Sequence, residues 1–492
     1  MAKKGEPVRN VMLDDDEFFR IRNEEVLPMW KTGEGVRDLD ECIKVAKELA
    51  GDQDKNYADT AWAAHEGGYH LLQPQFGHAL TEQLLDGMLY VESESPLMPN
   101  GLWNIYSDSY TRKCRFDLAQ VGLERTIQEG ETMLNGWPIV NYGVEEARKV
   151  KQAVRAPMTL NSTDEDGRLA SEIALAAGWN ACNCRSLQEV IAHCKNIPLE
   201  EEIRINQYEA RLAAKYHEGG HHMAPHITSN LTGYDAPGFK ALVMTAQTLI
   251  GAAQGIKQFY FELGLNQNIM QDCATINVTQ KLSREYLDKF GFTDTKFTTA
   301  AFPFLGAWPP RIDEAEAMVC WNTVDTFLAG IDIAILKCRD EAFATPTKEG
   351  MANSVRMSRQ LDTLIGATRW DTTGENYKLE EQMIELEVRS ILDKCLEVAD
   401  GDAVIALCKG VEAGWIDAML TPWVHNHGKV RLMRNAEKEQ RYWDMGDLPV
   451  PQEVRDYHRK KLESREKAEG RELSFDMLVS DLQYASRIAP QV

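Results

Sequence analysis

Residues 313–350 read DEAEAMVCWNTVDTFLAGIDIAILKCRDEAFATPTKEG, and this stretch indicates the architecture of the chain. Its first half predicts a helix with Asp313 as the N-cap, because apolar residues recur at three- and four-residue spacing. These residues are Ala317, Cys320, Trp321, Val324, Phe327 and Leu328. Gly330 ends the helix, and the apolar run 333–336 predicts a strand buried on both faces, as in parallel sheets. The run stops at Lys337, in a charged loop. Such a loop is either a solvated connection or, because α/β folds place their chemistry at strand ends, part of a site.

The composition restricts the function classes that need consideration. The chain has 492 residues, of which 43% are apolar, enough for a large core or for several domains. Its formal net charge of -22 argues against nucleic acids and anionic membranes as partners, because phosphate binding needs a basic face. The start, MAKKGEPVRN, lacks the apolar segment of a signal peptide. We therefore expect a cytoplasmic protein whose ten cysteines are reduced.

Two groups of residues resemble metal ligands by type but not by spacing. Cys182 and Cys184 are separated by one residue, which makes a poor chelate. The histidines between 217 and 226 include a helical spacing, but the glycines and the proline among them favour a turn that leads into a strand. The sequence therefore predicts no metal site.

Strand-like apolar runs alternate with helix-like segments over much of the chain. Nine runs qualify: 69–72, 101–106, 136–141, 156–160, 178–182, 221–227, 258–263, 297–302 and 331–337. Repeated βα units favour an α/β fold of the (β/α)8 TIM-barrel type over an open doubly wound sheet, although a barrel needs eight strands and one candidate must lie outside. We predict an N-terminal helical arm (1–56), a TIM barrel carrying the active site (57–375) and a C-terminal α-rich extension (376–492).

Four segments, in order along the chain, resemble the large (epsilon, or E) subunit of glutamate mutase, also called methylaspartate mutase. They are LNGWPIVNYG (134–143), QGIKQFYFELGLNQNIMQD (254–272), ILKCRDEAFATPTKEG (335–350) and YHRKKLESREKAEGRELSFDM (457–477). The resemblance extends from about residue 15 to residue 485. It implies a TIM barrel, in agreement with the alternation above, and an isomerase that uses adenosylcobalamin to rearrange glutamate into 3-methylaspartate.

The resemblance also implies a partner. In this family, cobalt is bound by a histidine in the D-x-H-x-x-G motif of a separate small subunit, and this chain lacks that motif. The implied assembly is a heterotetramer in which the small subunit caps the barrel mouth and the cofactor lies between the subunits.

Positions on the cofactor side follow the family pattern. Gly77 and Asn135 match positions that contact cobalamin, and Leu305 aligns near another such contact. Lys337 and Glu341 match the pair that touches the adenosyl ribose, so the resemblance assigns both to cofactor binding and catalysis.

Positions on the substrate side depart from the pattern. The family holds the two carboxylates of its substrate with three arginines, of which only Arg112 is present here. The other two positions are Gln75 and Asn161. Asn183 stands where the family has a glutamate that receives the substrate amine, and two family tyrosines align with Glu189 and His193. Other cations near the site in sequence are Arg168 and Arg185.

These departures predict a mutase with a modified substrate. Arg112 would anchor an amino, 2-oxo or hydroxy acid that carries less negative charge than glutamate, or a different polar tail. Two alternatives remain open from the sequence. One is a catalytically inactive paralogue that binds the cobalamin subunit. The other is a cobalamin-independent barrel lyase or hydrolase, although no metal triad or nucleophile–base pair stands out.

Overall fold

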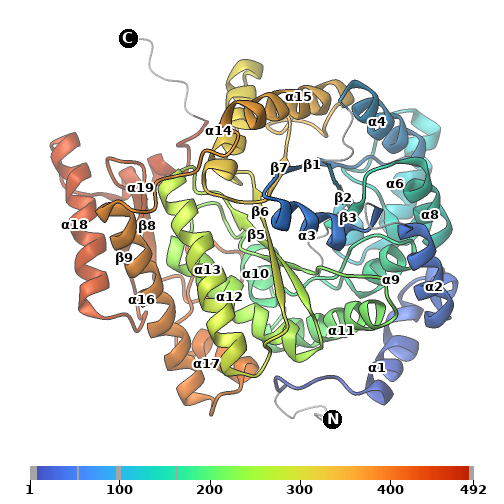
Figure 1. Ribbon diagram of the computed structural model, residues 1–492, viewed down its shortest axis with the longest axis horizontal. Helices are drawn as coiled ribbons and strands as arrows, with labels where there is room; N and C mark the ends of the chain where they lie inside the picture. Colours follow the sequence, from blue (N-terminus) through green and yellow to red (C-terminus); the bar gives the residue numbers. More distant parts are fainter. Residues whose placement is uncertain (1–7, 52–54, 96–100, 162–164, 487–492) are drawn as a thin grey trace.

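Parallel strands alternate with helices from residue 57 onward and wind into a barrel (Figure 1). The computed structural model describes residues 8–51, 55–95, 101–161 and 165–486. Seven strands form one parallel sheet in the order β3-β2-β1-β7-β6-β5-β4. They are β1 (Leu71–Phe76), β2 (Trp103–Tyr106), β3 (Met158–Asn161), β4 (His226–Thr228), β5 (Gln258–Gly264), β6 (Lys296–Phe302) and β7 (Ile333–Leu336). The predicted α/β fold of the TIM-barrel type is confirmed.

The barrel closes through a short segment that carries Asn180 and Asn183. Thr159 of β3 pairs with Asn180, and Asn183 pairs with His226 of β4, both in parallel register. The segment therefore occupies the place of the remaining strand. It is irregular because Cys182 has a φ of 75°, a left-handed conformation that interrupts an extended ladder.

The candidate run that lies outside the barrel is 136–141. Its second half is a single helical turn, α7 (Ile139–Tyr142), with Pro138 as the N-cap. Gly136 packs against the loop after β2, where an added Cβ atom would lie 2.6 Å from the carbonyl carbon of Ser107. The run resembles a strand in composition, but its glycine allows a close approach of two loops and its proline starts a turn.

Strand β1 is longer than the sequence indicated. The predicted run 69–72 ends before the Gln-Pro-Gln segment, whereas β1 continues through that segment to Phe76. Pro74 is opposite Leu336 in the last pair between β1 and β7. Gln75 pairs with Asn104 of β2, so it belongs to the rim of the barrel and not to a loop.

Helices connect the strands, and most of them run along the outside of the barrel (Figure 1). They are α4 (Thr81–Glu94), α5 (Ser109–Arg112), α6 (Phe116–Glu129), α8 (Val144–Ala153), α9 (Arg168–Ala176), α10 (Ser186–Ala192), α11 (Leu199–Glu218), α12 (Pro237–Ala253), α13 (Ile269–Lys289), α14 (Ile312–Leu328) and α15 (Lys348–Ile365). The N-cap of α14 is Arg311 and not Asp313 as predicted. Asp313 lies in the first turn and forms an ion pair with Arg311 at 3.1 Å. Gly330 follows the helix with a φ of 78°, as expected of a helix stop.

Helix α3 (Tyr57–Gly67) closes the amino-terminal end of the barrel. Its buried face packs on the first residues of β1 and β7, Leu71 and Ile333. Several hydrogen bonds hold it in place: Gln258 Nε2 donates to the carbonyl of Ala58 at 2.9 Å, for example, and the Tyr57 hydroxyl donates to Gln73 at 3.3 Å. Because this end is filled, the cavity of the barrel opens only toward the carboxyl ends of the strands.

The N-terminal arm packs against the barrel helices through a buried ion pair. The arm comprises α1 (Asp15–Ile21), a π-helical turn (Arg22–Val26), two short 3-10 helices (Leu27–Met29 and Lys31–Val36) and α2 (Leu39–Ala50). Arg22 contacts Glu172 of α9 at 2.8 Å, and the Tyr208 hydroxyl of α11 also donates to Glu172. The first seven residues of the predicted arm lie outside the described residues.

The C-terminal part packs beside α12 and α13 and contains a hairpin that the sequence pattern did not predict (Figure 1). Its elements are α16 (Glu375–Val398), α17 (Ala403–Glu412), β8 (Arg431–Arg434), β9 (Gln440–Asp444), α18 (Gln452–Glu469) and α19 (Phe475–Asp481). Strands β8 and β9 are antiparallel. Arg441 of β9 contacts the buried Glu380 of α16 at 2.8 Å, and Gln271 of α13 donates to the same carboxylate at 2.9 Å. The hairpin is thus tied to the barrel through α16.

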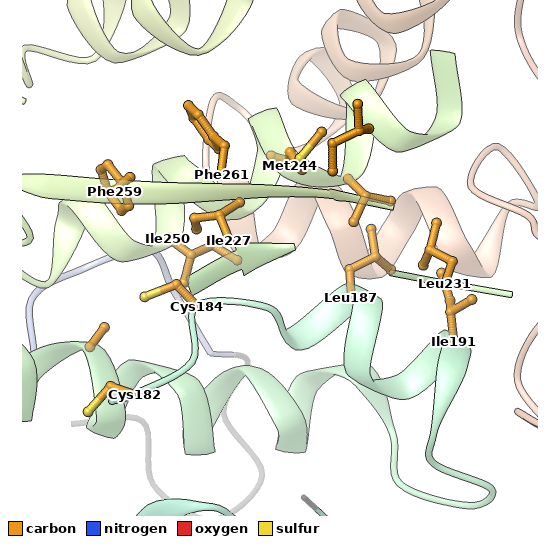
Figure 2. Close-up of a cluster of buried hydrophobic side chains, with 14 of the residues drawn as sticks. Cys182, Cys184, Leu187, Ile191, Ile227, Leu231, Met244, Ile250, Phe259 and Phe261 are labelled. Atoms are coloured by element: carbon orange, nitrogen blue, oxygen red, sulfur yellow. The ribbon is translucent and has the colours of Figure 1, made fainter. Parts of the chain in front are cut away.

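The apolar core lies between the strands and the surrounding helices. Figure 2 shows one part of it, where Ile227 of β4 and Phe261 of β5 lie among side chains of α10 and α12. Cys182 and Cys184 belong to this core, and all ten cysteines are free thiols. Within the described residues, no helix combines the length and the apolar composition needed to cross a bilayer.

Candidate active site

A cavity of about 510 Å³ opens at the carboxyl ends of the strands. Its walls come from several strand ends and from the loops that follow them. The lining residues are Gln75, Tyr106, Arg112, Asn135, Asn161, Arg185, Gln188, His193, Asn230, Phe302, Leu305, Lys337, Glu341, Phe343, Ala344, Thr345 and Pro346. The structure thus brings together eight residues singled out from the sequence: Gln75, Arg112, Asn135, Asn161, His193, Leu305, Lys337 and Glu341.

One wall of the cavity is formed by Lys337 and Glu341. Lys337 is the first residue after β7, and its ammonium group donates a hydrogen bond to the Glu341 carboxylate. The Lys337 side chain is only 10% exposed, and its Nζ atom lies 5.4 Å from the centre of the Phe302 ring. A hydrogen-bond donor and an acceptor therefore stand side by side above an aromatic surface. Such a pair suits a ligand with hydroxyl groups.

The loop that follows this pair is held by Asp340. Asp340 Oδ2 accepts hydrogen bonds from the backbone N–H of Thr347 at 2.8 Å and from the Thr347 hydroxyl at 2.7 Å. The Cys338 thiol also points to this carboxylate, and its burial raises the pKa of the thiol well above the ordinary range. These bonds set the course of the segment 343–346, which forms the adjoining part of the lining.

A second wall carries Arg112 on the short helical turn α5. Asp108 caps this turn by accepting hydrogen bonds from the backbone N–H groups of Tyr110 (2.9 Å) and Thr111 (3.2 Å). Burial raises the pKa of the Asp108 carboxyl. Asn135 Oδ1 accepts from the backbone N–H of Ser109 at 2.9 Å. Asn135 therefore holds the turn that carries Arg112, in addition to lining the cavity.

The deep wall consists of α10 and the end of β3. Arg185 Nη1 donates to Asn161 Oδ1 at 3.3 Å, and Arg185 Nε lies 3.2 Å from Glu189 Oε2 one helical turn later. Gln188 donates to the carbonyl of Asn230 at 2.6 Å. These contacts combine one buried ion pair with several amide groups.

His193 completes the deep wall as a neutral imidazole. Burial, with Arg185 and Arg112 nearby, lowers the pKa of His193 to about 3. Its Nε2 atom lies 3.3 Å from Gln188 Nε2. At neutral pH this side chain contributes no charge to the cavity and can donate or accept a hydrogen bond.

Three of the residues singled out from the sequence do not line the cavity. Asn183 pairs with His226 where the barrel closes. Glu189 is 2% exposed and lies behind Arg185. Gly77 follows β1 and packs on Tyr106, whose carbonyl oxygen would lie 2.9 Å from an added Cβ atom.

The structure also adds lining residues that the sequence did not suggest. Tyr106 and Phe302 end β2 and β6, and Asn230 follows β4. A polar or aromatic residue at a strand end is a signal that could have found them. Gln188 carries no such signal, because it lies on a helix. Of the two additional cations, only Arg185 lines the cavity, whereas Arg168 pairs with Asp166 at 2.6 Å.

Comparison with known proteins identifies the family. The family described as Methylaspartate mutase E chain (MutE) matches residues 52–488. The chain belongs to this family. It is 32% identical over 476 residues to the glutamate mutase epsilon subunit of Desulfitobacterium hafniense, with 96% of each chain covered. It is 31% identical to that of Treponema denticola (96% of each chain) and 30% identical to that of Yersinia enterocolitica (97% of this chain, 98% of the relative). The resemblance inferred from the sequence is confirmed, and a member of this mutase family is an enzyme of the isomerase class.

The side chains that could hold a metal ion are scattered. Among the described residues, no three His, Cys, Asp or Glu side chains come together as a metal site.

Proposed function

We propose that this chain is the substrate-binding large subunit of an adenosylcobalamin-dependent carbon-skeleton mutase whose substrate differs from L-glutamate. One observation carries the proposal. In a member of the methylaspartate mutase E chain family, the cavity keeps Lys337 and Glu341 together on one wall but has neutral Gln75 and Asn161 among its lining.

The cavity suits the adenosyl end of the cofactor. The Lys337 ammonium group can donate to a ribose hydroxyl and the Glu341 carboxylate can accept from one, while Phe302 and Leu305 offer apolar surface beside them. Adenosylcobalamin, when bound, supplies the radical that removes a hydrogen atom from the substrate and later returns it. Lys337 and Glu341 would hold the ribose in position, and the closed walls of the barrel would exclude water from the reacting atoms.

The cobalt end of the cofactor requires a partner subunit. The chain lacks the D-x-H-x-x-G motif, and the relatives are named as epsilon subunits, a name that implies at least one further subunit. We infer a small cobalamin-binding subunit with that motif, which covers the barrel mouth and forms a heterotetramer with this chain.

The substrate side of the cavity lacks the charges that a dicarboxylate needs. An arginine–carboxylate contact in a buried site contributes on the order of 1.5–3 kcal/mol. Gln75 and Asn161 offer amides in place of two such contacts. Arg112 would then be the principal carboxylate anchor, with an amino, 2-oxo or hydroxy acid as substrate.

The test of this proposal is a turnover assay with the reconstituted complex. The chain is mixed with its small subunit and adenosylcobalamin, and L-glutamate and 3-methylaspartate are compared with acids that carry one carboxylate. We expect kcat/KM for L-glutamate to fall at least about a hundredfold below that for the preferred acid, because two charge-assisted contacts are missing. Efficient turnover of L-glutamate would overturn the substrate proposal. A complex that turns over none of the acids would favour a non-catalytic binding subunit.

A further inference from the structure

The deep wall contains a buried ion pair in which a nitrogen of the guanidinium group has no hydrogen-bond partner among the described residues. Arg185 is 1% exposed and Glu189 is 2% exposed, and the atoms Nε and Oε2 are 3.2 Å apart. Arg185 Nη1 is engaged by Asn161 Oδ1 at 3.3 Å. Arg185 Nη2 is buried and has no hydrogen-bond partner among the described residues, although Arg185 lines the cavity. A buried N–H group without an acceptor destabilises the folded protein. A ligand in the cavity that offers a hydrogen-bond acceptor to Nη2 would remove this penalty.

Glu189 determines which kind of acceptor fits. Because its carboxylate is beside Arg185, the pair has no net charge, and a ligand at Nη2 meets a hydrogen-bond donor without meeting an uncompensated cation. A second substrate carboxylate at this end would lose its hydration and would also lie close to the negative charge of Glu189. A carbonyl, amide or hydroxyl oxygen would accept the same hydrogen bond without either cost.

The charges around the whole cavity agree with a monoanionic ligand. Among the described residues, the lining contains three cations, Arg112, Arg185 and Lys337, and one acid, Glu341. With Glu189 included, cations exceed acids by one. Burial raises the pKa of Glu262, which lies near Arg185, to about 7, so this acid adds part of a negative charge near neutral pH and further disfavours a second carboxylate.

We propose that the Arg185–Glu189 pair is the specificity determinant of this site, and that it selects a substrate with one carboxylate and a neutral tail that accepts a hydrogen bond. The inference rests on the proposed mutase function and names the substrate class for it. Arg112 would bind the single carboxylate, and Arg185 Nη2 would donate to the tail.

The experiment is a calorimetric binding study of the full-length chain at pH 7.5 with two acids of equal chain length. Glutarate carries two carboxylates, whereas glutaramate carries one carboxylate and one neutral amide. We expect the unmodified chain to bind glutaramate at least tenfold more tightly than glutarate. We expect Glu189→Gln to shift this preference at least tenfold toward glutarate, because the variant leaves Arg185 as an uncompensated cation.

The matched control is the double variant Arg185→Gln/Glu189→Gln. It removes both buried charges and leaves no unpaired ion, so it remains testable even where Glu189→Gln folds poorly. We expect the double variant to gain no affinity for glutarate. A gain in the double variant equal to that of Glu189→Gln would overturn the role of Arg185.

The unmodified chain separates this inference from the proposed function. Equal binding of the two acids, or tighter binding of glutarate, overturns the inference and leaves the mutase proposal in place. Binding of neither acid overturns both the inference and the proposed substrate site.

Discussion

Lys337 and Glu341 show how one pair of residues can have either a structural or a functional meaning. On a helix surface, an i, i+4 pair of this kind stabilises a protein by a few tenths of a kcal/mol. Here the lysine directly follows a buried strand, and both side chains line the cavity. The small stabilisation from a surface ion pair does not explain why the Lys337 side chain is only 10% exposed and lies beside the Phe302 ring.

We predict that Lys337→Ala lowers kcat/KM of the reconstituted complex at least tenfold, or about 1.4 kcal/mol of transition-state stabilisation. The physical reason is the loss of the donor that would position the ribose of the cofactor. Thermal unfolding and subunit assembly should be unchanged, which differential scanning calorimetry and gel filtration would measure.

Lys44→Ala is the matched control for this prediction. Lys44 forms a comparable pair with Glu41 at 3.2 Å, but both side chains are more than half exposed on α2. This variant should keep full turnover. If Lys337→Ala kept it as well, the Lys337–Glu341 pair would be no more than a structural link.

At the scale of elements, α16 joins the C-terminal hairpin to the barrel through buried carboxyl groups. The Tyr442 hydroxyl of β9 donates to Glu387 Oε1 at 2.8 Å, and His458 Nε2 of α18 lies 3.8 Å from Glu387 Oε2. Burial, together with the neighbouring Glu380, raises the pKa of Glu387 to about 8. Burial lowers the pKa of His458 to about 3. The part of this interface around Glu387 is therefore made by neutral groups, in contrast to the Arg441–Glu380 ion pair beside it.

This contact predicts a pH dependence of stability. A carboxyl whose pKa is raised on folding stabilises the fold fully below the pKa of the unfolded chain, and this stabilisation is lost as the pH rises through the folded pKa. For Glu387 the window runs from 4.5 to about 8. The loss amounts to roughly 1.4 kcal/mol for each pH unit within it.

Glu387→Gln isolates this effect, because its amide resembles the neutral acid but does not titrate. We expect the unfolding free energy of the unmodified chain, minus that of Glu387→Gln, to fall as the pH rises from 5 to 8. Urea unfolding followed by circular dichroism at several pH values measures this difference.

Glu385→Gln, on the same helix, is the control. The pKa of Glu385 is lowered by its cationic partners despite partial burial. The unfolding free energy of the unmodified chain, minus that of Glu385→Gln, should therefore not fall between pH 5 and pH 8. A flat difference for Glu387→Gln would show that Glu387 is ionised in the folded protein.

At the scale of the whole molecule, the barrel is filled at one end and open at the other. Helix α3 closes the amino-terminal end. The carboxyl end leaves aromatic side chains in solvent, with Phe343 at 62% and Tyr110 at 40% exposure. The cavity of about 510 Å³ at this end encloses little of a ligand as large as cobalamin.

We predict that the isolated chain does not bind adenosylcobalamin tightly, and that addition of a small subunit with the D-x-H-x-x-G motif produces a two-plus-two complex that does. The reason is that the cobalt ligand and the cover of the mouth both come from the partner. Spectrophotometric titration measures cofactor binding, and analytical ultracentrifugation measures the assembly. Submicromolar binding of the cofactor by the isolated chain would contradict this prediction.

Much of the fold was predictable from the sequence because the spacing of apolar residues along a segment indicates whether it forms a helix or a strand. The run 333–336 is strand β7, and the helix before it is α14, since apolar spacing records which face of an element is buried. Polar residues just after strands pointed to the end of the barrel at which the cavity opens, because parallel strands all finish at the same rim.

Tertiary structure alone decided the remaining features, and each depends on residues that are distant in the chain. Run 136–141 has the composition of a strand, but its approach to the loop after β2 makes it a turn. Glu189 aligned with a substrate position of the family, and only the fold shows that it is buried in an ion pair with Arg185. The sequence by itself determined the alternation of strands and helices in most of the barrel, the family and the end of the barrel at which the cavity opens, because these depend on local spacing and on segments read in order. The pairing of charges inside the cavity was decided by the closed barrel, because burial and ion-pair partners are set by contacts that no local spacing records.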